Sequence, residues 1–208
     1  MLTTDPSLIV QDTAKVDLWI ARLGVFRHEP DALPQRRRLV RETVARHLNR
    51  NPEQITVSHT GSGQPQVLRC GNPIPLAIST ASCRDVVVIA LATNGPVGVD
   101  VQAVEDEHPH VQQRALTPAE FRDLHARPGN QIPDAWMAYW TRKEALLKGL
   151  GVGIRVEPAT VPLPPLPQDW DGRAQAVPGG GCVTSWGGRG ELVISLWTSG
   201  EPTVRRHF

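Results

Sequence analysis

Two apolar runs near the middle of the chain give its clearest pattern. The first run, DVVVIALAT, is almost continuously apolar, and the second, PVGVDVQAV, alternates valine with glycine, aspartate and glutamine. Such runs are typical of strands, and the Asn94-Gly95 pair between them favours a tight hairpin with positive φ at both turn residues. Because side chains alternate along a strand, we expect Asp100 and Gln102 to project from one face while the valines pack into the other.

Helical patterns lie on both sides of these strands. From Pro34 to Arg50, apolar residues recur every four positions with arginines on the other faces, as in an amphipathic helix. Thr117 and Glu120 form a capping-box pattern that predicts the start of a second helix. A third helical pattern covers residues 133–150 and is ended by the glycines of GLGVG.

Two further segments complete the pattern. EPATVPLPPLPQDWDG is too rich in proline for a helix or a central strand and predicts an extended surface loop. GCVTSWGGRGELVISLW predicts a last β-hairpin. Since helices and strands are mixed on both sides of Asn94, the predicted fold class is α+β.

Composition narrows the classes of function. The 208 residues carry 22 basic and 21 acidic side chains, which argues against nucleic-acid binding through general electrostatics, although a local basic cluster could hold a phosphate ligand. No apolar stretch approaches the ~20 residues that cross a bilayer, and the N-terminus has no basic start followed by an apolar run, so we expect a cytoplasmic protein that does not bind membranes. Three widely spaced cysteines predict free thiols.

The scarcity of lysine makes the stretch WTRKEALLKGLG unusual. Only three of the 22 basic residues are lysines, and two of them, Lys143 and Lys148, flank Glu144. On a helix, Glu144 and Lys148 share a face, and the simplest interpretation is an exposed ion pair worth ~0.3–0.5 kcal/mol. In a chain that uses arginine for solvated charge, the two lysines instead favour a phosphate site, because an ammonium acts on phosphate as a compact point charge.

Asp100 allows two interpretations as well. It could be a strand-end aspartate that makes a local turn or solvent contact. However, Gly98 leaves the same face of the strand without a side chain, as the close approach of a ligand would require. Mg²⁺ is bound through one or two carboxylates together with substrate phosphates and water, and Asp100 and Glu144 could be those carboxylates.

These motifs resemble a known enzyme family. PVGVDVQ, followed 44 residues after Asp100 by the glutamate of WTRKEALLKGLG, resembles the paired signatures (V/I)G(V/I)D and (W/F)xxKE(A/S)xxK of 4′-phosphopantetheinyl transferases of the surfactin-synthetase type. TPAEFRDL between them is similar to the SPxE segment of that family. RRRLVRETVARHL lies where the family has its first basic helix, and SGQPQVL where it has a GKPxL segment.

The resemblance implies a fold and an activity. The fold would consist of two similar α/β subdomains, residues 1–96 and 97–208, in a pseudo-twofold arrangement with the active site between them. The enzyme would be a monomer that moves the phosphopantetheine arm of coenzyme A to a serine of an acyl or peptidyl carrier protein, releasing adenosine 3′,5′-bisphosphate. Mg²⁺ or Mn²⁺ would be the metal ion, and residues 151–182 would meet the carrier protein.

The resemblance also implies roles for single residues. Asp100 and Glu144 match the metal-binding acids, with Gln102 as a third candidate ligand. Glu144 is the candidate acceptor of the serine proton, directly or through a water molecule, and Lys148 contacts phosphate. Asp100, Glu144 and Lys148 are thus the predicted catalytic set. The predicted coenzyme A-binding residues are Arg37, Arg41 (one helical turn further on), Gln64, Ser79, Thr80, Lys143 and Lys148.

Three positions depart from the family pattern. Gln102 stands where many relatives have glutamate, and Gln64 replaces the lysine of the GKP segment. STAS stands where many relatives have Ser-His-Ser, so Ser79 and Thr80 are the nearest matches and the histidine contact is missing. Two alternatives therefore stay open: a catalytically weak module that binds coenzyme A or a carrier protein, and another Mg²⁺-dependent phosphoryl-transfer enzyme. His59 is interpreted as a loop histidine, since no acid or nucleophile motif accompanies it.

Overall fold

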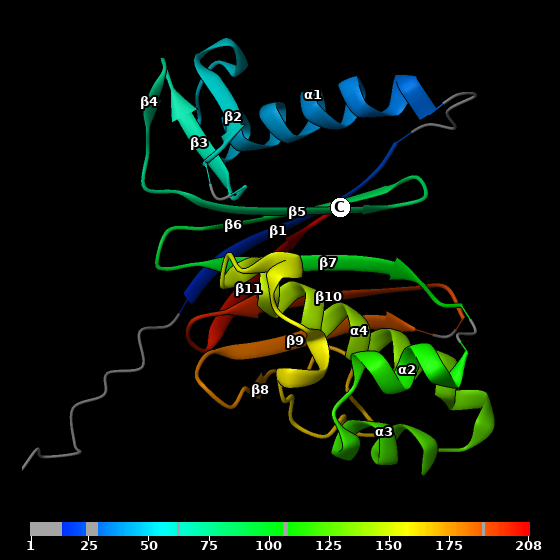
Figure 1. The fold of residues 1–208 in the computed structure, drawn as a ribbon. Helices are drawn as coiled ribbons and strands as arrows, with labels where there is room; N and C mark the ends of the chain where they lie inside the picture. The colour runs from blue at the N-terminus through cyan, green and yellow to red at the C-terminus, as the bar shows by residue number, and fades with distance from the viewer. Residues whose placement is uncertain (1–13, 24–28, 62, 106–107, 189) are drawn as a thin grey trace, which may run out of the picture.

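The strands form three sheets within the part of the chain that the computed structural model describes, residues 14–23, 29–61, 63–105, 108–188 and 190–208. The first sheet has the order β11-β1-β6-β5, the second β7-β10-β9-β8, and the third, smaller one β2-β3-β4 (Figure 1). The first sheet contains β1 (Ala14–Arg22), β5 (Ala77–Cys83), β6 (Val86–Ala92) and β11 (Pro202–His207). The second sheet contains β7 (Val97–Ala103), β8 (Gln175–Ala176), β9 (Cys182–Gly188) and β10 (Leu192–Thr198). The third sheet contains β2 (Ile55–His59), β3 (Pro65–Arg69) and β4 (Asn72–Pro73).

The two larger sheets pack face to face. Val86, Val88 and Ala90 of β6 share one buried apolar cluster with Val97 and Val99 of β7. This is the alternation that the sequence predicts for residues 97–103, and it leaves Gly98, Asp100 and Gln102 on the opposite face of the second sheet. The edge strands β5 and β7 are joined by a hydrogen bond from the Val99 amide to Ser79 Oγ, at 3.0 Å.

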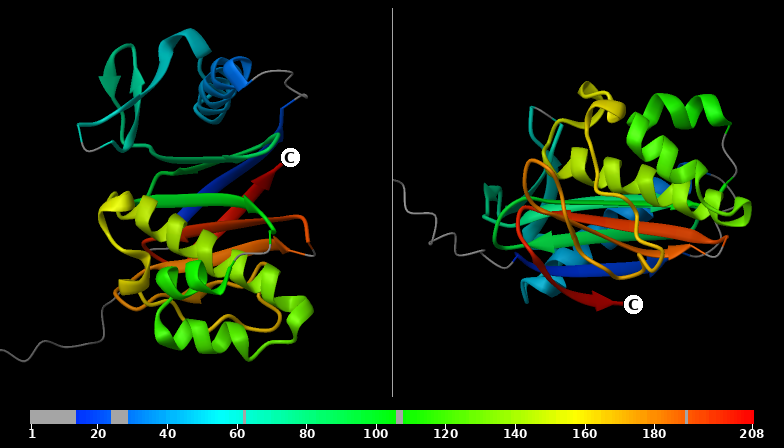
Figure 2. Two further views of the ribbon diagram at one scale, coloured as in Figure 1. Left: turned by 45° about the vertical axis from the view of Figure 1, so that its right-hand side comes forward. Right: turned by 90° about the horizontal axis from the view of Figure 1, so that it is seen from below.

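One long helix covers the outer face of each large sheet. α1 (Glu29–His47) packs through Val44 and Ala45 on the other face of β6, where Val87 and Ile89 are buried. α4 (Ile132–Gly149) packs on the second sheet, and Figures 1 and 2 show the two helices on opposite sides of the paired sheets. Two shorter helices, α2 (Pro109–Ala115) and α3 (Pro118–His125), precede α4.

Several predicted elements are confirmed. The Thr117 amide donates to the Glu120 carboxylate at 2.7 Å and the Glu120 amide to Thr117 Oγ1 at 3.2 Å, which is the predicted capping box. β9 and β10 form the predicted last hairpin, and all three cysteines are free thiols. α1 begins before the predicted start, so Pro34 lies inside it. Among the described residues, no helix is both long and apolar enough to span a membrane.

The predicted hairpin at Asn94-Gly95 is wrong. β6 pairs with β1 and β5, whereas β7 pairs with β10, so the turn carries the chain from one sheet to the other. Gly95 has a φ of +95°, but Asn94 does not have a positive φ. All seven residues of β6 are buried, because one face packs against the second sheet and the other against α1 and the third sheet. Turn chemistry predicts where a chain reverses, but it does not select the strand that pairs.

The C-terminal part differs from expectation in two ways. The proline-rich segment is irregular, as predicted, but Leu163, Leu166 and Trp170 are buried in the cluster beneath α4, so the segment is not a surface loop throughout. β11 pairs in parallel with β1 and thus belongs to the first sheet, although the predicted boundary assigns it to the C-terminal subdomain.

Candidate active site

Gly98 allows α4 to lie directly on β7. A Cβ at this position would come within 1.9 Å of the Ala145 carbonyl oxygen and 2.5 Å of the Gly149 amide nitrogen, both backbone atoms of α4. Only a glycine fits such an approach. The prediction that Gly98 makes room for a ligand is therefore wrong, because the helix itself occupies that space and is held close to Asp100.

Asp100 and Lys148 form the central ion pair of the site. Lys148 Nζ lies 2.6 Å from Asp100 Oδ1 and also donates to the Val99 carbonyl at 3.3 Å. The Asp100 side chain is only 4% exposed, whereas that of Lys148 is 33% exposed. The aspartate is thus fixed inside the protein, and the lysine extends from it towards solvent.

Glu144 lies on α4 one turn before Lys148, and its charge interacts with that of Asp100. Burial raises the pKa of Glu144, the Asp100 carboxylate raises it further, and Lys148 opposes the shift. Burial also raises the pKa of Asp100, against the opposing effect of Lys148. Two partly desolvated carboxylates that repel each other favour either a shared cation or a proton.

The donor set fits a hard divalent cation. Asp100 and Glu144 supply carboxylate oxygens, and the Gln102 amide lies beside Asp100, with Nε2 at 3.5 Å from Oδ2. No group of three His, Cys, Asp or Glu side chains with metal-site geometry occurs among the residues described. Mg²⁺ requires only one or two protein carboxylates when water and substrate phosphates complete its octahedron. The site therefore fits such an ion only together with a phosphate ligand.

A cleft begins at Lys148 and extends beneath α1. It consists of two adjoining pockets of about 880 and 910 Å³. His59, Pro65, Thr80 and Lys148 line both of them, so these residues mark where the two pockets meet. The cleft is long enough to contact α1, the β2–β3 hairpin and the C-terminal end of α4.

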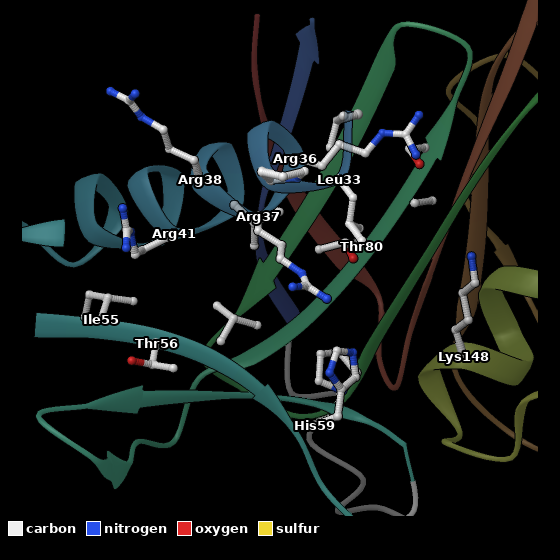
Figure 3. Close-up of a pocket in the computed structure, with 17 residues that line it drawn as sticks. Leu33, Arg36, Arg37, Arg38, Arg41, Ile55, Thr56, His59, Thr80 and Lys148 are labelled. Atoms are coloured by element: carbon white, nitrogen blue, oxygen red, sulfur yellow. The ribbon is translucent and has the colours of Figure 1, made fainter. Parts of the chain in front are cut away.

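Arg37 and Arg41 line the first pocket, as predicted for a basic helix. Figure 3 shows Arg37 directed into the space that His59 and Thr80 face, whereas Arg38 points away from it. Arg38 is paired with Glu42 at 2.7 Å, and Arg36 donates to the Arg84 carbonyl at 3.4 Å. All four of these arginines line the first pocket, but Arg36 and Arg38 have partners within the protein.

Gln64, Ser79 and Thr80 lie around the second pocket. The Ser79 hydroxyl accepts a hydrogen bond from the Val99 amide, and the residue is buried. Ser79 therefore joins the two large sheets. Gln64 packs against Gly151, where an added Cβ would come within 2.0 Å of Gln64 Nε2. These residues bring the β2–β3 hairpin and the turn after α4 together at the edge of the cleft.

Lys143 does not lie in the cleft, which corrects its prediction as a coenzyme A-binding residue. Its side chain is 0% exposed, and Nζ lies 2.8 Å from the Glu120 carboxylate, 2.8 Å from the Pro158 carbonyl and 2.7 Å from the Val161 carbonyl. All three ammonium hydrogens are used. Lys143 therefore ties α4 to α3 and to the proline-rich segment.

His59 is the residue of the cleft for which sequence reasoning gave no role. It is the last residue of β2 and is exposed. A single histidine in a short strand has no spacing or partner motif that would mark it, and only its place between the two pockets draws attention to it.

Comparisons with known proteins agree with the two motifs. Residues 96–175 match the model of the 4′-phosphopantetheinyl transferase superfamily. A 4′-phosphopantetheinyl transferase of Bacillus pumilus is 27% identical over 124 residues, 57% of this chain and 52% of that protein. The L-aminoadipate-semialdehyde dehydrogenase-phosphopantetheinyl transferase of Mus musculus is 26% identical over 148 residues, 65% of this chain and 48% of that protein. The chain spans about half the length of the curated relatives it matches.

Proposed function

We propose that the protein transfers the phosphopantetheine arm of coenzyme A to a serine of an acyl or peptidyl carrier protein, because residues 96–175 match the model of the 4′-phosphopantetheinyl transferase superfamily. Adenosine 3′,5′-bisphosphate would be the second product. The observation that carries the proposal is the meeting of Asp100, Glu144 and Lys148 where α4 lies on β7. Of these three residues, Lys148 lines the cleft, which Arg37 and Arg41 line from α1.

The reaction requires a proton acceptor and neutralised phosphate charge. The serine oxygen forms a bond to the phosphorus that carries the pantetheine arm, the bond from that phosphorus to the bridging oxygen breaks, and the serine proton passes to Glu144. The raised pKa of Glu144 makes its carboxylate a better proton acceptor than an exposed glutamate. Lys148, which pairs with Asp100 and lines the cleft, would stabilise the negative charge that develops on phosphate oxygens.

We further propose the metal and ligand contacts that the family resemblance implies. Asp100 and Glu144, with Gln102 beside them, would hold Mg²⁺ or Mn²⁺, which when bound would neutralise charge on the pyrophosphate. Arg37 and Arg41 would bind the nucleotide end of coenzyme A through its phosphates. Gln64, Ser79 and Thr80 would line the path of the ligand between these two ends.

The larger organisation of the protein is part of the same proposal. Two four-stranded sheets, each covered by one long helix, support a pseudo-twofold pair of subdomains, residues 1–96 and 97–208, with the cleft between them, although β11 of the second half completes the first sheet. Residues 151–182 would meet the carrier protein, since this segment follows α4 beside the cleft. We propose that the enzyme acts as a cytoplasmic monomer.

Intact mass spectrometry of an apo carrier protein tests the proposal. The carrier is incubated with the protein, coenzyme A and Mg²⁺, and a second sample contains a chelator. A gain of one phosphopantetheinyl group that the chelator abolishes is the expected result. Binding of coenzyme A without any gain, across several acyl and peptidyl carriers, would instead favour a catalytically weak binding module. Bisphosphate release without a carrier would favour another phosphoryl-transfer enzyme.

A further inference from the structure

His59 occupies the junction of the cleft. It is one of four residues that line both pockets, and with Thr80 and Lys148 it is one of the three that carry a polar side chain. Figure 3 shows its ring on the hairpin side, near the space entered by Arg37, with Lys148 on the opposite wall. A ligand that occupies both pockets would therefore lie beside the imidazole.

The imidazole of His59 is available to a ligand. Its side chain is exposed, and no residue that the structure describes is in hydrogen-bond or ion-pair contact with the ring. Lys148 on the opposite wall differs in this respect, since its ammonium is paired with Asp100. A ring nitrogen that carries hydrogen can thus donate into the cleft without breaking an existing bond.

The charge of the cleft indicates the kind of ligand. Among the described residues that line the two pockets there is no aspartate or glutamate, whereas arginine or lysine side chains come from α1, from α4 and from the turn that follows α4, where Arg155 lies. A cleft with cations at both ends and no acid in its lining suits a ligand with separate phosphate groups. At its centre, His59 supplies a donor between Arg37 and Lys148.

We propose that His59 binds coenzyme A by donating a hydrogen bond from its imidazole to a phosphate group at the junction of the two pockets. The inference rests on the proposed function and adds to it a ligand-binding residue on β2. Thr80 lies at the same junction, so a phosphate there would have the imidazole of His59 and the hydroxyl of Thr80 within the same part of the cleft.

Calorimetric titration with coenzyme A tests the role of His59. Because a hydrogen bond to a charged group contributes ~1.5–3 kcal/mol, His59→Ala is expected to weaken binding by roughly 10-fold to 100-fold. His59→Gln, which keeps an N–H donor, is expected to recover part of that loss. His110→Ala changes an exposed histidine of α2, remote from the lining of both pockets, and is the matched control with wild-type affinity.

The same titration with 3′-dephospho-coenzyme A identifies the phosphate. An equal loss with both ligands places the contact at the pyrophosphate, and a loss with coenzyme A alone places it at the 3′-phosphate; either result supports the inference. Wild-type affinity of a folded His59→Ala variant would overturn it while leaving the proposed function intact. If the wild-type protein itself does not bind coenzyme A, both the proposed function and the role of His59 fall.

Discussion

Replacing Gly98 with alanine tests whether the close contact between β7 and α4 builds the site. The added methyl group would lie 1.9 Å from the Ala145 carbonyl oxygen, and real Cβ contacts essentially never fall below 3.0 Å. The difference of about 1.1 Å must be absorbed by moving α4 away from β7 or by distorting one of them. Both neighbours are backbone, so no flexible side chain can give way.

The displacement has two expected consequences. Overpacking of this kind costs ~1–3 kcal/mol of stability, which corresponds to a fall in Tm of roughly 2–12 °C for a chain of this size. Asp100 lies on β7, whereas Glu144 and Lys148 lie on α4, so the same movement separates the three groups that we propose to be catalytic. Because a misplacement of ~1 Å can lower a rate by ~100-fold, we expect transfer to fall by about that factor.

Thermal unfolding and the rate of carrier-protein modification measure these two effects. Gly129→Ala is the matched control, because a Cβ there meets no atom within 4 Å and the backbone φ is not positive. It should change stability by less than ~0.5 kcal/mol and leave the rate unaffected. A Gly98→Ala protein with wild-type Tm and rate would refute the reasoning that this contact positions the site.

Three further predictions address single interactions. The Glu144→Gln protein should unfold at the wild-type Tm but transfer phosphopantetheine at least ~100-fold more slowly, as measured by the intact mass of the carrier protein. Near-normal turnover would contradict the proposed role of Glu144 as proton acceptor. Glu120→Gln leaves the Lys143 ammonium buried without its counter-ion, so the free energy of unfolding, measured in urea, should fall by ~3–5 kcal/mol. A fall below ~1 kcal/mol would show that stability does not depend on the pair. Burial would raise the pKa of Asp17, but hydrogen bonds from Arg205 and His207 lower it to about 2. Its stabilisation is therefore present above the unfolded value of 3.8 and lost as pH falls towards 2, so Asp17→Asn should flatten the acid limb of unfolding curves measured between pH 5 and 2.

Local patterns predicted the parts of the site that depend on one element. The alternation of residues 97–103 placed Asp100 and Gln102 on one face of a strand, and the spacing of Glu144 and Lys148 placed them on one helix. Both placements depend only on the periods at which side chains repeat in a strand and in a helix, and these periods can be read from the local sequence. The resemblance to the 4′-phosphopantetheinyl transferase superfamily, first indicated by the same two motifs, agrees with the match of its model to residues 96–175.

Contacts between distant segments could not be predicted in the same way. The residues of Asn94-Gly95 favour a reversal, but β6 pairs with the preceding strand β5 and with distant β1, and β7 pairs with distant β10. Lys143 precedes Glu144 by one position, about 100° around the helix, so it was always more suited to another face. Its acceptors on α3 and the proline-rich segment became visible only in three dimensions.

The parallel pairing of β1 with β11 bears on how the protein forms during translation. Asp17 and Arg205, which are hydrogen-bonded across these strands, are 188 residues apart. β1 therefore leaves the ribosome long before β11 is synthesised. Until then, the edge of the first sheet at β1 has no pairing strand. Such an edge is a template for pairing with other chains. We therefore expect the nascent protein to depend on chaperones more than its modest size suggests, and its N-terminal half alone to be a poor fragment for expression.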